Sequence, residues 1–196
     1  MHIRIKTRFI FLFLAATAVF TAVSASAQTS APAEPQPHPE LAVVYNYVRS
    51  NAPPGGCGCI NLNGGSASFA WPFKAGHLSL VGDIGAVHGG SSSSEIGDLT
   101  LSSYTGGLRY SPRKYARRLQ PWGQLLIGGS HASGSAVEDS GSWAFAALAG
   151  GGLDARATRH FSLRIIEADY LATTFTNGIN DHQNNLRLAA GLVFRF

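Results

Sequence analysis

Residues 186–196 alternate strictly between two kinds of side chain. One set is apolar and ends on an aromatic residue, whereas the other includes Arg187 and Arg195. Because successive side chains of a β-strand point to opposite faces, the segment predicts a strand with one apolar face and one charged face. Its length matches the ~9–11 residues that a tilted strand needs to cross a bilayer. An edge strand of a soluble sandwich would show the same alternation, so the rest of the chain has to decide.

Comparable segments recur along the chain, and no helical period follows the N-terminal region. The predicted strands are 41–49, 61–73, 78–87, 99–110, 120–130, 142–154, 161–175 and 184–196. Long connections rich in Gly, Ser, Asn and acidic residues follow every odd-numbered strand, and shorter connections follow the second and sixth. The connection 111–119 departs from this rule because it is long and strongly basic. The pattern predicts an all-β fold, an eight-stranded antiparallel up-and-down transmembrane β-barrel.

The N-terminal region reads as a targeting segment. Arg4, Lys6 and Arg8 precede an apolar run over 9–20, and a small-residue cleavage signature lies at 25–27. That arrangement is typical of a secretory signal peptide. We therefore expect a signal peptide over 1–27, a Pro-rich linker over 28–39 and the barrel over 40–196.

Composition and charge favour a lipid-facing strand protein. The full chain has 15 basic and 11 acidic residues, but three of the basic residues lie in the predicted signal peptide. The remainder is close to neutral, which gives no argument for nucleic-acid binding. Charged residues make up only 13% of the chain, and glycine is abundant at 23 residues. These values fit a barrel whose outer face meets lipid.

Aromatic residues gather at the predicted strand ends. Five lie at the ends where the chain termini would be, and three lie at the opposite ends: Trp71, Tyr110, Trp122, Phe161 and Phe196, then Tyr47, Trp143 and Phe175. Aromatic side chains of membrane barrels form a belt at each interface. Aromatic residues that merely flank turns are the alternative explanation.

The charged residues of the strands fall largely on the inward-facing phase. A β-bulge near Ile165 and Ile166 would bring the three charges of the seventh strand to the same side. Since an eight-stranded barrel has an interior about filled by side chains, these charges should pair across it as a polar plug. A narrow ion path is the alternative. The predicted lumen charge network is Asp83, Arg109, Asp154, Arg164, Glu167, Asp169, Arg187 and Arg195.

The chain resembles the small eight-stranded outer-membrane β-barrel proteins, such as the membrane domains of OmpA-like and OmpX-like proteins. The resemblance rests on the closing residues 191–196 and the signal peptide, with weaker support from 80–85 and 164–170. It implies a Gram-negative outer membrane, outer-membrane lipids including lipopolysaccharide as partners, and the outer-membrane assembly machinery reading Phe194 and Phe196. We expect a monomer with both termini in the periplasm and the long loops outside. The sequence ends at the barrel, so no peptidoglycan-binding domain is implied.

Other residues offer weaker chemistry. Histidines, serines and acidic residues share the long loops, and the histidines include His88, His131 and His182. The sequence has no His-x-Ser-Asn motif like that of the small lipid A deacylases. Cys57 and Cys59 could form a disulfide across Gly58 in an oxidising compartment, with a redox or metal role as the alternative. We expect no enzyme activity, metal or cofactor. The sequence predicts a structural or surface-interaction barrel, with a small-conductance porin and a lipid A-modifying enzyme as alternatives.

Overall fold

The structure is a computed structural model, and it describes residues 38–50, 60–73, 77–89, 98–112, 118–134, 142–175 and 181–196. The predicted signal peptide, residues 28–37 of the predicted linker, and both Cys57 and Cys59 lie outside these residues. In the described part of the chain, no helix combines the length and apolarity needed to cross a membrane.

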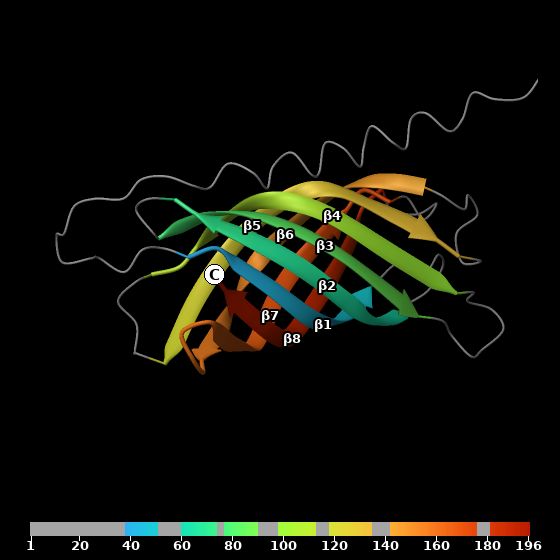
Figure 1. Cartoon of the computed structure of the whole chain (residues 1–196). Helices are drawn as coiled ribbons and strands as arrows, with labels where there is room; N and C mark the ends of the chain where they lie inside the picture. The colour runs from blue at the N-terminus through green and yellow to red at the C-terminus, as the bar shows by residue number, and fades with distance from the viewer. Residues whose placement is uncertain are drawn as a thin grey trace, which may run out of the picture. The chain divides into compact units, whose positions relative to one another are not determined.

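Eight strands close into a single antiparallel barrel (Figure 1). Each strand pairs with its sequence neighbours, and β1 pairs with β8 from Glu40 opposite Arg195 to Ser50 opposite Asn185. The predicted fold and strand count are confirmed. The strands are β1 (Glu40–Ser50), β2 (Ile60–Pro72), β3 (Leu78–Gly89), β4 (Leu99–Tyr110), β5 (Leu119–Ser133), β6 (Ser142–Arg156), β7 (Phe161–Thr173) and β8 (Gln183–Arg195).

The strand bounds differ from the prediction mainly in β5 and β7. β5 continues to Ser133 because its last residues still pair with β4, where Ser133 lies opposite Thr100. β7 ends at Thr173, after which the Thr174 amide donates to the Phe145 carbonyl and the chain leaves the β8 ladder. The residues around both strand ends are mostly small or polar, so the alternation in the sequence does not mark where either strand stops.

The barrel has two ends that we name by their connections. The turn end carries 73–77, 111–118 and 157–160, and the loop end carries 51–59, 90–98, 134–141 and 174–182. The backbone amide of Phe196 donates to the Pro39 carbonyl at 3.1 Å, so β1 begins and β8 finishes at the turn end. An even number of strands requires this arrangement.

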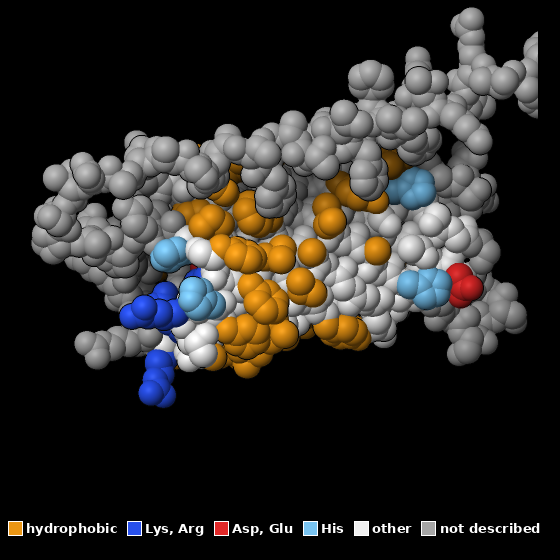
Figure 2. All heavy atoms as spheres, viewed as in Figure 1, with side chains coloured by type: hydrophobic (Ala, Val, Ile, Leu, Met, Phe, Trp, Pro, Cys, Tyr) orange, Lys and Arg blue, Asp and Glu red, His pale blue; other side chains and the backbone are white. Residues whose placement is uncertain are grey.

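The exterior is an apolar surface. Large hydrophobic side chains are more than one-third exposed on every strand, and they include Val43, Phe69, Ile84, Leu108, Leu125, Phe145, Leu163 and Leu192. Figure 2 shows hydrophobic side chains spread over the middle of the visible face of the barrel. The inward-facing positions between them are buried. The alternation therefore places apolar groups on the outside of the barrel, opposite to the arrangement of a water-soluble protein.

The lumen is not uniformly polar. Its loop-end half holds a buried apolar cluster to which seven strands contribute, beside uncharged polar side chains such as Ser130 and Thr173. Ala70 and Val81 extend the cluster along β2 and β3. We call the loop-end members the inner apolar cluster: Val48, Ile60, Leu62, Val87, Leu99, Leu101, Leu126, Ala132, Ala146, Leu148 and Leu171. Phe175 packs against it. The predicted polar plug is therefore confined to the other half of the lumen.

The aromatic residues follow the predicted belts with two exceptions. Trp71, Tyr110 and Phe196 are exposed at the turn end, and Trp143 is exposed at the loop end. Trp122 was predicted for the turn-end belt, but it lies inside the lumen and is 6% exposed. Phe175 likewise packs inward instead of joining the loop-end belt. Both predictions are wrong because position near a strand end does not decide which face a side chain occupies.

Candidate functional site in the charged half of the lumen

A β-bulge in β7 determines which charges reach the lumen. The pairing of β7 with β8 shifts register between Arg164 and Glu167, as the sequence predicted. Ile165 and Ile166 both face outward, 46% and 50% exposed, so Arg164 and Glu167 both point inward. The bulge thereby places opposite charges of one strand side by side within the barrel.

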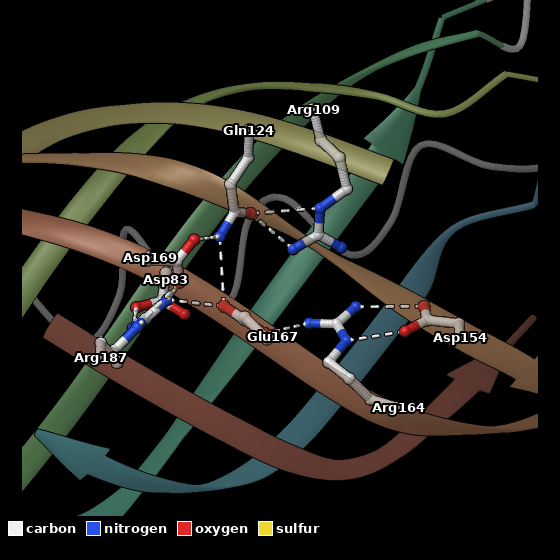
Figure 3. Close-up of polar contacts among 8 residues, drawn as sticks. All are labelled: Asp83, Arg109, Gln124, Asp154, Arg164, Glu167, Asp169 and Arg187. Atoms are coloured by element: carbon white, nitrogen blue, oxygen red, sulfur yellow. Dashed lines mark hydrogen bonds and ion pairs between the residues drawn. The ribbon is translucent and has the colours of Figure 1, made fainter. Parts of the chain in front are cut away.

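Arg164 forms one centre of the network (Figure 3). Its guanidinium binds Asp154 of β6 through two nitrogens, with Nε to Oδ1 at 3.0 Å and Nη2 to Oδ2 at 3.3 Å. Its Nη1 donates to Glu167 Oε2 at 2.8 Å. All three side chains are at most 3% exposed. A two-nitrogen contact of this kind fixes the orientation of the guanidinium as well as its charge.

Arg187 forms the second centre and gathers three carboxylates. It contacts Asp83 at 3.0 Å, Glu167 at 2.7 Å and Asp169 at 2.8 Å. Asp83 belongs to β3, on the far side of the barrel from β7 and β8 in strand order. The Arg187 side chain therefore crosses the lumen and ties together strands that share no backbone ladder.

Gln124 of β5 connects these two centres to Arg109. Its side-chain nitrogen donates to Glu167 Oε1 at 3.2 Å and to Asp169 Oδ1 at 3.3 Å. Its side-chain oxygen accepts from Arg109 Nε and Nη2, at 3.2 and 2.8 Å. Arg109 was expected to face a carboxylate, but among the described residues it forms no ion pair, because Gln124 lies between it and the acids.

Trp122 supports two guanidiniums of the network. The guanidinium carbons of Arg109 and Arg164 lie 4.2 and 4.3 Å from the centroid of its ring. A desolvated cation over an indole face is stabilised by the ring quadrupole. The indole therefore partly replaces the carboxylate that Arg109 lacks.

Glycines of β6 make room for these side chains. A Cβ atom built at Gly152 would lie 2.6 Å from the Trp122 ring and 2.6 Å from the Ile166 carbonyl oxygen. One built at Gly150 would collide with the Asp169 carboxylate. The run of glycines at 150–152 is thus required by close approach and not by an unusual backbone conformation.

Arg195 was predicted for the same network but lies in a separate cluster at the turn end. It pairs with Glu40 at 2.6 Å and also donates to Gln120 at 3.3 Å and to Ser162. Glu40 was not among the predicted site residues. Because Glu40 and Arg195 are directly opposed in the β1–β8 ladder, this pair lies across the seam at which the barrel closes.

Several polar atoms of the lumen have no hydrogen-bond partner among the described residues. They include Asn46 Oδ1, Ser66 Oγ, Thr105 Oγ1 and Trp122 Nε1. A cavity of about 10 Å³ lies against Asn46, Val48 and Arg187, at the boundary between the charged half and the inner apolar cluster. That volume is close to the minimum for a single water molecule.

The structure brings seven of the eight predicted lumen charges into one connected group and leaves Arg195 apart. Sequence analysis missed Gln124, Trp122 and Glu40. The signal for the first two was present, since Trp122, Gln124 and Leu126 share one phase of β5, and that phase points inward. Glu40 lies at the first residue of its strand, where alternation gives little information.

The loop-end histidines belong to no metal-ligand group in the described part of the chain. His88 Nδ1 lies 2.8 Å from Thr100 Oγ1, and the His131 ring packs on Trp143 with centroids 5.0 Å apart. Among the described residues, no group of three His, Cys, Asp or Glu side chains could hold a metal ion.

Comparisons with known proteins agree on the fold. No protein-family model matches the chain, and no curated protein matches it. Three crystal structures are similar over most of their length. Neisserial surface protein A has a TM-score of 0.61 and 14% identity, covering 81% of this chain and 97% of its own. Ail, the attachment invasion locus protein of Yersinia pestis, has a TM-score of 0.55 and 17% identity, and the match covers 82% of this chain and 99% of Ail.

The third is the outer membrane enzyme PagL, with a TM-score of 0.51 and 16% identity, covering 76% of this chain and 97% of PagL. At these identities the likeness concerns the fold and not the activity. The chain has the fold of the small eight-stranded outer-membrane β-barrels.

Proposed function

We propose that this protein is an integral outer-membrane barrel with a closed lumen and a structural or surface-interaction role. The observation that carries the proposal is the lumen itself, in which seven charged side chains connect in one half and a buried apolar cluster packs in the other. The exposed apolar exterior supports membrane insertion, because soluble monomers rarely expose apolar patches beyond a few hundred Å². Lipopolysaccharide and other outer-membrane lipids would then surround it.

Single-channel recording separates a closed barrel from a pore. Wild-type protein folded into planar bilayers should give few or no channel openings, because a permeating ion would have to separate the ion pairs and cross the inner apolar cluster. Arg164→Ala should also conduct no ions, because the inner apolar cluster is intact in this variant. It should, however, unfold at a lower urea concentration than the wild type. An unchanged urea midpoint for this variant, together with clear wild-type channel steps, would contradict the closed-lumen proposal.

A small-conductance porin is the alternative, and one observation favours it. The unpartnered polar atoms of Ser66 and Thr105 face the lumen, as they would if water occupied part of it. A wet lumen would conduct cations or anions with a selectivity set by its charges. The recordings above therefore decide between the two roles.

The orientation is proposed from topology. With an even strand count, both ends of the chain lie at the turn end of the barrel, which we assign to the periplasm. Tags inserted in 91–94 or 134–136 should react on intact cells, and a tag in 113–117 should not. Labelling of the basic turn on sealed cells would reverse the assignment.

The terminal aromatic residue is proposed as an assembly signal. Phe196 is 64% exposed at the turn end, and Phe194 beside it packs edge-on against Phe161 at 5.4 Å between centroids. Phe196→Asp should leave the chain in the periplasm and reduce the folded, heat-modifiable form in outer-membrane fractions. Phe161→Leu is the matched control, since it alters the aromatic cluster and leaves the terminus intact.

The proposal contains no catalytic role. PagL is an enzyme with a similar fold, so a lipid A-modifying activity is the second alternative. Lipid A profiles of a deletion strain should equal those of the parent strain. A missing or added acyl chain in the deletion strain would require the enzyme alternative.

A further inference from the structure

The two ends of the barrel carry opposite charge. The turn-end connections contain Lys74, Arg113, Lys114, Arg117, Arg118 and Arg159 and no acidic residue, and β6 ends on Arg156 at the same end. The loop-end connections contain no lysine or arginine, and they hold Glu95, Asp98, Glu138, Asp139 and Asp181. Figure 2 shows basic side chains gathered at one end of the barrel and an acidic group at the other. This separation is far from an even mixture of charges.

Three of the turn-end arginines lie in the described part of the chain, and we call them the basic rim: Arg118, Arg156 and Arg159. All three are exposed. The Arg156 amide donates to the Arg118 carbonyl at 2.7 Å, so these two residues are neighbours across β5 and β6. Exposed His160 adjoins Arg159 in sequence. The rim therefore presents adjacent exposed cations at the turn end of the barrel.

No acidic side chain neutralises the rim in the described structure. None of its arginines makes an ion pair there. Glu40, the acid whose strand begins at this end, is engaged by Arg195 at 2.6 Å. The cations are thus available to an external anion.

The depth of the rim matches a layer of lipid phosphates. Arg118 comes directly before Leu119, which is 42% exposed on the apolar exterior, and Trp71 and Tyr110 are exposed at the same end. The headgroup layer is about 5–7 Å thick on each side of the hydrocarbon. A tilted strand advances roughly 2.5 Å per residue along the membrane normal. One or two residues beyond the apolar surface therefore reach the headgroup layer.

We propose that the basic rim binds the phosphates of anionic phospholipids in the leaflet that meets the turn end. The proposal rests on membrane insertion under the proposed function and adds a lipid class to it. Arginine suits this role because its planar guanidinium forms two parallel hydrogen bonds to a phosphate. Bound phospholipid would fix the depth and tilt of the barrel.

Spin-label electron paramagnetic resonance tests the proposal on the full barrel in phosphatidylcholine vesicles. Spin-labelled phosphatidylglycerol should associate with the wild type roughly fivefold more strongly than spin-labelled phosphatidylcholine, the factor that one well-placed arginine supplies. The triple variant Arg118→Gln, Arg156→Gln and Arg159→Gln should lose at least half of this preference. Raised salt should weaken the preference in the wild type.

Arg49→Gln is the matched control because it removes an exposed arginine at the loop end of β1. It should keep the wild-type preference. Equal association of both lipids with the wild type, or an unchanged preference in the triple variant, would overturn the proposal. Heat-modifiability on gels reports insertion separately, so a barrel that inserts without lipid preference refutes only the basic rim, and one that fails to insert refutes the proposed function.

Discussion

The two halves of the lumen close the same barrel by different physical means. The charged half joins Arg164 and Arg187 to carboxylates from β3, β6 and β7, whereas the loop-end half packs leucines, valines and alanines. Apolar packing is non-directional, so truncating one side chain costs the lost burial and a cavity. A buried ion pair is directional, and removing one member leaves the other charged and unsolvated. Stability should therefore depend on the partners left unpaired in the charged half and on the volume removed in the loop-end half.

Arg187→Met should have the largest effect, because methionine keeps much of the volume while three carboxylates lose their shared cation. Breaking a buried pair typically costs about 3–5 kcal/mol. Urea unfolding in lipid vesicles should show this loss. Arg49→Met, at an exposed position, leaves no buried charge unpaired and should lower the free energy of unfolding far less. Equal, small effects of the two variants would indicate that water solvates the lumen carboxylates.

Leu148→Ala tests the other half. Leu148 is 1% exposed within the inner apolar cluster, and a buried leucine truncated to alanine typically costs about 2–5 kcal/mol. The cavity should stay dry because apolar cavities do, so the variant should conduct no better than the wild type in planar bilayers. Channel openings appearing in Leu148→Ala alone would mean that the inner apolar cluster, and not the charge network, is the barrier to ions.

Gly152→Ala should have an intermediate effect. Its methyl group would meet the Trp122 ring and the Ile166 carbonyl, and overpacking typically costs about 1–3 kcal/mol. Trp122 should also change its environment, which tryptophan fluorescence reports. Gly82→Ala is the control, since no heavy atom lies within 4 Å of a Cβ at that exterior position. If both variants unfold at the same urea concentration, the interior beside Trp122 is looser than described.

Thr105→Val should have the smallest effect and the opposite sign. The Thr105 hydroxyl is buried without a partner among the described residues, so replacing it should leave stability unchanged or raise it by up to about 1 kcal/mol. Unfolding in urea measures the change. A loss of stability would mean that an ordered water bonds this hydroxyl, which would favour the wet-lumen alternative.

The sequence by itself determined the strand count, most strand limits and the bulge of β7. These follow from period-two alternation, because that period is fixed by the backbone and needs no knowledge of neighbours. It also identified the lumen charges, since Asp83, Arg164 and Arg187 interrupt otherwise apolar strands. Where the residues of one phase of a strand were clearly polar, the sequence showed which side chains point into the lumen.

Only the tertiary structure decided which partners these residues meet. Residues 123–130 of β5 and 144–152 of β6 are small or apolar on both phases except at Gln124 and Ser130, so alternation could not distinguish their lumen side from their lipid side. The inner apolar cluster was missed for that reason. Arg187 and Asp83, which are in contact, lie 104 residues apart in the sequence. Arg195 is separated from the network because the register of β1 and β8 places it opposite Glu40. Pairing across a closed lumen is a property of the barrel geometry, which no single strand encodes.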